Sequence, residues 1–295
     1  MALAAQTTTA ATGSVAATEL TAEQVIKTLI QPLEQASTFL SSGVRIIESA
    51  SPVRLPVGAT SKASSLSFFG ENELIDDVDY AFDEVELMPS TMKSIKVISK
   101  YSSELARQSI INLDQAIKDR LVADVAAKID THFLGAGGDG ASTPQGLFGF
   151  TGTQSVDLAT DALDLDAILA GLGKLVAKHV PATGLKLFVS AADYLAIRGT
   201  KDADGRYILS PETQTGLGSP LLGITPILTD RLPARKAALV SPSHITVVRD
   251  AAPSIKILDQ TYADHDTLAI RVVGRWDAKP TNPDAIVIFN NIGAA

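Results

Sequence analysis

Apolar residues recur at helical spacing in two parts of the first half of the chain. Residues 21–42 carry one such pattern, which predicts one kinked helix or two short helices. A stronger pattern begins at Ser102 or Ser103 and runs to Gly135, with an apolar residue at every fourth position over Leu113, Ile117, Leu121, Val125, Ile129 and Phe133. It predicts a single helix of about thirty residues, or about 45 Å, with one buried apolar face.

Short apolar runs separated by Pro, Gly and Asp dominate the second half of the chain and predict strands. We expect one helix at 166–179 and strands at 185–190, 224–229, 237–241, 245–249, 255–258, 268–276 and 285–289. Residues 44–57 are also expected to be extended, although two prolines keep them out of a regular central strand. The pattern therefore predicts that residues 151–295 mix helices and strands.

Residues 58–92 combine alternating apolar residues with a run of acids. Between Ala63 and Met92 there are eight acidic side chains and no basic one. The alternation favours a two-stranded hairpin, and an isolated hairpin is marginally stable in water. We therefore expect it to dock on another subunit. The candidate contacts are the acidic residues Glu71, Glu73, Asp76 and Asp77 and the basic residues Arg45, Arg54, Lys93, Lys96, Lys100 and Arg107.

Composition excludes several classes of site. The 295 residues include no cysteine, which rules out disulfides, thiol nucleophiles and thiolate zinc sites. A net charge of −8 argues against a dedicated nucleic-acid binder. No apolar run approaches the roughly 20 residues of a membrane span. The Ala/Thr-rich tract at 1–18 has no basic region, so it is expected to be a loosely held arm and not a signal peptide.

No catalytic motif emerges from the residues. Gly135, Gly137 and Gly140 have the spacing of a dinucleotide-binding motif, but they follow a helix and not a strand, which favours a helix end and a turn. There is no phosphate-binding P-loop and no nucleophile elbow, and the four histidines are scattered. The acidic run is expected to be a solvated hairpin face and not a cation site. We expect no enzyme activity, no cofactor and no metal.

Five segments together resemble the major capsid proteins of tailed bacteriophages of the Hong Kong 97 type. They occur in the family's order and are FFGENELIDDVDYAFDEVELMPSTMKSIKVISKYSSELARQS, GAGGDGASTPQGLFG, FVSAADYLAIRGTKDADGRYIL, SPLLGITPILTDRLP and AIRVVGRWDAKPTNPDAIVIF. Each segment alone is a weak match, but the series covers about residues 43–290. The third segment resembles a part of the family that begins with a helix.

The resemblance implies an α+β capsid fold with four parts. Residues 1–42 would be an N-terminal arm, and 43–100 the extended hairpin called the E-loop with its flanking strands. Residues 101–150 would hold the long spine helix of the peripheral (P) domain, which 245–275 complete. Residues 151–244 would form the mixed α/β axial (A) domain, which 276–295 complete.

The resemblance also implies a structural protein that self-assembles, as pentamers and hexamers, into an icosahedral shell around double-stranded DNA. Expected partners are other copies of the chain, a portal, a separate scaffolding protein, a decoration protein, and DNA contacted without sequence specificity; no membrane is expected. The protein would occupy the virion, and the host cytoplasm during assembly. Two alternatives are the shell protein of an encapsulin-type nanocompartment and, with no motif in its favour, an acidic α/β hydrolase or metal enzyme.

Overall fold

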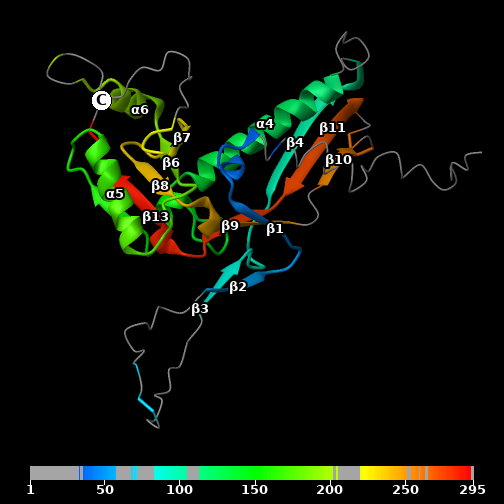
Figure 1. Ribbon diagram of the computed structural model, residues 1–295. Coiled ribbons are helices and arrows are strands. Elements are labelled where there is room, and N and C mark those ends of the chain that lie inside the picture. The colour runs from blue at the N-terminus through cyan, green and yellow to red at the C-terminus, as the bar shows by residue number, and fades with distance from the viewer. Residues whose placement is uncertain are drawn as a thin grey trace, which may run out of the picture. The chain divides into compact units, whose positions relative to one another are not determined.

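The computed structural model describes residues 33, 36–57, 68, 70–71, 83–104, 113–201, 204, 220–250, 254–258, 260–262 and 265–293 (Figure 1). Its longer helices are α4 (Leu113–Phe133), α5 (Leu165–Ala177) and α6 (Ala191–Arg198). Its strands are β1 (Arg45–Glu48), β2 (Val53–Val57), β3 (Asp83–Leu87), β4 (Ile95–Ser102), β5 (Gln154–Asp157), β6 (Lys186–Val189), β7 (Thr225–Leu228), β8 (Ala237–Val240), β9 (Ile245–Arg249), β10 (Ser254–Leu258), β11 (Thr267–Gly274), β12 (Trp276–Pro280) and β13 (Ile286–Asn290).

The strands and the helix predicted for the second half of the chain are confirmed. The run at 268–276 is corrected: it is two strands, β11 and β12, separated at Arg275. Most of the helix predicted at 21–42 lies outside the described residues, which show a short 3-10 turn at Leu40–Ser42.

The chain forms two compact units. One consists of Met1–Leu33, Ser94–Val125 and Ala252–Gly274, and the other of Glu34–Lys93, Ala126–Ala251 and Arg275–Ala295. The domain limits expected from the resemblance stay predictions.

The first unit contains an antiparallel sheet in the order β10-β11-β4. All eight residues of β4 pair with β11, from Ile95 opposite Gly274 to Ser102 opposite Thr267. After β4 the chain turns into helix, and the Ser102 hydroxyl accepts the Glu104 N–H at 3.2 Å, as an N-cap does. This contact supports the predicted helix start, while residues 105–112 lie outside the described residues.

The second unit is built on a five-stranded sheet in the order β5-β13-β8-β6-β7. Side chains alternate between its two faces. Leu187, Leu239 and Phe289 share one core with α5 and α6, whereas the ring of Phe188 lies 6.3 Å from that of Phe39. Both faces are thus covered, which explains why β8 consists of buried residues throughout. A second sheet in this unit has the order β1-β9-β12.

The predicted phase of the long helix is confirmed where side chains are described. Leu121, Val125, Ile129 and Phe133 are all buried. Ile117 is only half-buried, and the side chains of Leu113 and Asp114 lie outside the described set. The helix ends at Phe133, two residues before the predicted stop at Gly135.

Asp130, in the last turn of α4, is a buried carboxylate that ties three parts of the second unit together. It accepts hydrogen bonds from the hydroxyls of Ser37 and Thr38, from the N–H groups of Thr38 and Phe39, and from the Arg231 guanidinium at 3.2 Å. Its side chain has no solvent exposure. Since buried polar groups are costly to leave unpaired, this carboxylate fixes the position of residues 37–39 on the helix end.

We predict that Asp130→Ala destabilises the unassembled subunit by about 3–5 kcal/mol, because it leaves a partly buried guanidinium and two N–H groups without their acceptor. Urea denaturation of the full chain measures the loss. Asp124→Ala is the matched control, since Asp124 is exposed on the same helix, where it pairs with Arg120 one turn away. It should cost no more than about 0.5 kcal/mol. Equal losses for the two variants would contradict the role given to Asp130.

Candidate functional site

The acidic hairpin is described at its base, where β2 and β3 pair. Arg54 lies opposite Glu86, Leu55 opposite Val85 and Val57 opposite Asp83. On β2 the apolar side chains are half-buried, and Arg54 and Pro56 between them are exposed. The base of the hairpin therefore has one apolar face and one exposed polar face.

The predicted contact residues that the structure describes lie on several different elements. Arg54 forms an ion pair with Glu84 of β3 at 3.7 Å, with both side chains more than 60% exposed (67% and 62%). Arg45 begins β1, Lys93 follows β3, and both are exposed, as is Glu71. Lys96 and Lys100 are exposed on β4 of the other unit, and Lys100 lies over the Tyr262 ring at 4.0 Å. Glu73, Asp76, Asp77 and Arg107 lie outside the described residues.

Two buried residues join the hairpin to the body of the second unit. Leu87 ends β3, Met88 follows it, and both pack against Val248 of β9 with almost no exposure. The Met88 N–H donates to the Asp277 carboxylate of β12 at 2.7 Å. Met88 has a φ of 53°, which is uncommon for a side chain of its size. The hydrogen bond and the apolar contact hold this turn in place.

Asp277 is a functional candidate that the sequence analysis missed. Its second oxygen accepts the Ala278 N–H at 2.9 Å, so backbone donors satisfy both oxygens. Burial raises the pKa of Asp277 above its ordinary value, while the Met88 N–H and the Lys279 charge oppose that shift. Asp277 directly follows the predicted strand 268–276, and its partner Met88 lies 189 residues away in the chain, so the local sequence pattern contains no sign of this contact.

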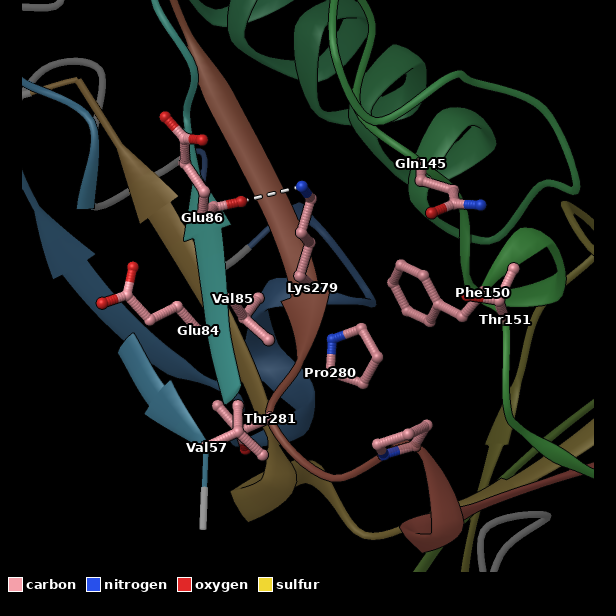
Figure 2. Close-up of a pocket in the computed structure, with 11 residues that line it drawn as sticks. Val57, Glu84, Val85, Glu86, Gln145, Phe150, Thr151, Lys279, Pro280 and Thr281 are labelled. Carbon is pink, nitrogen blue, oxygen red and sulfur yellow. Dashed lines mark hydrogen bonds between the residues drawn. The ribbon is translucent and has the colours of Figure 1, made fainter. Parts of the chain in front are cut away.

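A groove of about 410 Å³ lies beside the hairpin base. Figure 2 shows Val85 and Glu86 of β3 on one side of it, and Phe150 and Pro280 across from them. The Lys279 ammonium donates to the Glu86 carbonyl at 2.7 Å. This bond and the Met88–Asp277 bond attach both ends of one short stretch of chain to β12.

The glycine-rich segment after α4 is a turn, which confirms the interpretation preferred from sequence. Asp139 accepts the N–H groups of Ala141, Ser142 and Thr143, and these bonds lower its pKa. Gly138 has a φ of 97°, and a Cβ there would lie 1.9 Å from the Pro144 carbonyl oxygen. The segment contacts the chain after β3, because the Lys93 N–H donates to the Ser142 carbonyl at 2.9 Å.

Within the parts of the chain that the structure describes, no group of three or more His, Asp or Glu side chains is placed to hold a metal ion. Among the same residues, no helix has the length and apolar character needed to cross a bilayer.

Comparisons with known proteins point to one family. Residues 18–291 match the family model described as the phage capsid family. Among solved structures, the capsid of an empty GTA particle computed with C5 symmetry has a TM-score of 0.70 at 18% identity, covering 87% of this chain and 91% of that one. The chain from Mycobacterium phage Bobi has a TM-score of 0.67 at 17% identity, covering 86% and 90%.

A third solved structure is the virus-like particle from Pyrococcus furiosus, with a TM-score of 0.59 at 13% identity and coverage of 91% of this chain and 98% of that one. No curated protein matches the chain. At these identities the likeness shows the fold, which is the α+β fold of the similar capsid chains.

The raised pKa of Asp277 generates a prediction about pH. The folded protein keeps the Asp277 proton to a higher pH than the unfolded chain, whose pKa is near 3.8. The stability that Asp277 contributes is therefore greatest below that value and declines as pH rises through the folded pKa. Urea denaturation of the wild type and of Asp277→Asn, from about pH 4 to about pH 7, measures this term.

The stability difference, wild type minus Asp277→Asn, should fall as pH rises. Other carboxylates, such as Asp139, cancel in the difference because both proteins contain them. A difference that stays flat or increases with pH would contradict the burial effect assigned to Asp277.

Proposed function

This chain belongs to the phage capsid family, and from that premise we propose that it is the major capsid protein of a tailed phage. Many copies would self-assemble, as pentamers and hexamers, into an icosahedral shell around double-stranded DNA. The observation that carries the proposal is the family match over residues 18–291, which covers most of the chain.

The hairpin base supports the assembly role. β2 and β3 form a two-stranded ladder that is anchored at one end, by Met88 to Asp277 and by Glu86 to Lys279. Beyond the anchors its polar face is exposed, and such ladders gain stability by lying on a larger surface. We propose that the acidic segment, with Glu71, Glu73, Asp76 and Asp77, lies on a neighbouring copy as the E-loop of the shell.

Basic residues flanking the hairpin would supply the counter-charges on the neighbour. Arg45 and Lys93 are exposed in the second unit, and Lys96 in the first. Arg54 already has an intramolecular partner in Glu84, so a weaker intermolecular role is proposed for it. Exposed ion pairs contribute little singly, and a network repeated over a large interface sets the register between copies.

A structural role also accounts for the absence of recognisable chemistry. Membership of a capsid family points to a structural protein and not to an enzyme, and the sequence has no catalytic motif. The family supports a place in the virion. We propose residence in the host cytoplasm during assembly, non-specific contact with packaged DNA, and separate scaffolding, portal and decoration proteins as partners.

Copies in such a shell would be arranged around rotational axes. The similar GTA capsid was computed with C5 symmetry, which supports this arrangement. We propose that the five-stranded sheet with α5 and α6 forms the A domain, which lies nearest these axes, and that α4 is the spine helix of the P domain.

A nanocompartment shell is the second candidate, favoured by one observation. The virus-like particle from Pyrococcus furiosus shares the fold over 91% of this chain. A shell of that kind would have the same subunit contacts and a different content.

We predict that the purified full-length protein forms closed particles in negative-stain electron microscopy. Particles from the native source should contain nuclease-protected double-stranded DNA, because a phage shell encloses its genome. Closed particles without DNA that carry protein cargo would favour the nanocompartment. Protein that remains monomeric under all assembly conditions would contradict both shell functions.

We also predict that removing the acidic segment abolishes closure and leaves the fold intact. Val57 and Asp83 are directly opposed, so residues 58–82 can be replaced by Asn-Gly, which makes a two-residue hairpin turn. The shortened subunit should melt within a few degrees of the wild type and sediment as small species. A variant with Arg54→Ala alone is the control and should still assemble. Closed shells from the shortened chain would refute the proposed contact.

A further inference from the structure

Helix α5 presents an apolar surface on its outer side. Its inner side packs into the core of the second unit through Ala167, Ile168, Gly171 and Leu175. Its outer side carries Leu169 and Val176, which are 48% and 54% exposed. A surface helix normally has charged residues on that side.

Charged residues do not cover this outer surface. The thirteen residues of α5 include two charged ones, Asp166 in the first turn and Lys174. The Lys174 ammonium donates to the Ser155 carbonyl, and that of Lys178, after the helix, lies 3.3 Å from the Asp284 carboxylate. Both long side chains thus reach back to the subunit.

Gly173 lies on the outer side of α5, four residues after Leu169 and three before Val176, so the three residues are neighbours on the helix surface. A Cβ built at Gly173 meets nothing within 4 Å, in contrast to Gly171, where it would lie 2.8 Å from the Phe289 ring. Packing within the subunit therefore explains Gly171 and does not explain Gly173. Glycine weakens a helix relative to alanine, and a close approach from outside would account for it. We call Leu169, Gly173 and Val176 the α5 patch.

Two further exposed apolar residues lie on elements at the other edge of the same sheet. Leu195 of α6 is 52% exposed, and Leu222, in the turn before β7, is 47% exposed. We call these two residues the α6–β7 patch. α5 contacts β5, β13 and β8, whereas β7 is the opposite edge strand of the order β5-β13-β8-β6-β7. Figure 1 shows α5 beside β13, and α6 beside β6 and β7.

Leu222 is unusual for its turn. Leu221 and Ile224 exchange both backbone hydrogen bonds at 2.9 Å, and the two residues between them have φ values of 53° and 78°. A two-residue turn with both φ values positive favours Asn or Gly at its first position, and a leucine there is strained. Burial within the subunit does not explain a strained leucine that is half exposed. This points to a contact between Leu222 and another molecule.

We propose that the α5 patch of one copy packs against the α6–β7 patch of the next copy around a rotational axis. The proposal rests on the proposed shell function, since it needs copies related by rotation. A ring requires a head-to-tail interface, in which two different patches of the subunit meet. Two apolar patches at opposite edges of one sheet meet that requirement, and a second copy of this chain is the occupant that supplies both.

Leu222→Asn tests the proposal without threatening the fold. Asparagine suits the turn better than leucine, so the unassembled subunit should melt at the same temperature or higher. Closed particles, counted by electron microscopy after size-exclusion chromatography, should drop at least about tenfold, since burial of one leucine is worth roughly that much or more at each interface. Wild-type particle yield from Leu222→Asn would overturn the proposal. The same result is expected if the α5 patches of two copies packed against each other instead.

A charge-exchange experiment tests the pairing of the two patches. Leu169→Glu should fold and fail to close shells. Adding Leu222→Lys to it should restore particles, because the two charges would face each other across the interface. The matched control adds Ile98→Lys instead, at a residue that is 49% exposed in the other unit, and it should restore nothing.

The outcomes separate this proposal from the function on which it rests. A wild type that forms no particles contradicts the shell function itself. If the wild type assembles and the Leu169→Glu variant also assembles by itself, the α5 contact alone is overturned. Equal restoration by Leu222→Lys and Ile98→Lys would show an effect of net charge and would overturn the pairing.

Discussion

The second unit depends on the burial of one carboxylate. Asp130 lies in the last turn of α4, and its oxygens accept from residues 37–39 and from Arg231. The contacts join the chain before β1, the helix end and the chain after β7. A buried carboxylate without these donors would be strongly unfavourable, so the three segments are held in a single arrangement. The Phe39 ring, fixed in this way, lies 5.2 Å from Phe133 and 6.3 Å from Phe188, between the helix end and the five-stranded sheet.

A second buried carboxylate has the same relation to the hairpin. Asp277 of β12 holds the Met88 turn, and neighbouring Lys279 holds the Glu86 carbonyl. Both contacts lie at the end of the β2–β3 ladder that joins the body of the unit. A fixed base with an exposed polar face suits an element that contacts another copy, because the base sets its direction while the exposed face of β2 and β3 is open to contact. The two carboxylates therefore act on folding of the subunit, and assembly is assigned to different, exposed residues.

The sequence predicted the elements better than it predicted the contacts between them. The limits of β9 and the apolar phase of α4 followed from local periodicity, which depends on residues close in the chain. The short elements β5 and α6 gave too few periodic positions, and only the family resemblance suggested α6. Asp130 and Asp277 escaped because their partners lie 92 and 189 residues away. Local spacing contains no information about such pairs. The α5 patch escaped for a related reason, since apolar positions in a helix do not reveal which side the subunit itself covers.

A cryo-electron microscopy reconstruction of assembled wild-type particles tests most directly whether this chain builds a closed shell through exposed surfaces of the subunit. We expect an icosahedral shell in which α5 of each copy lies against α6 and the turn before β7 of the next copy. We also expect the Met88–Asp277 and Thr38–Asp130 contacts to persist within each copy. An open filament or an unclosed sheet of subunits would contradict this mode of assembly, as would a shell in which the outer side of α5 faces solvent.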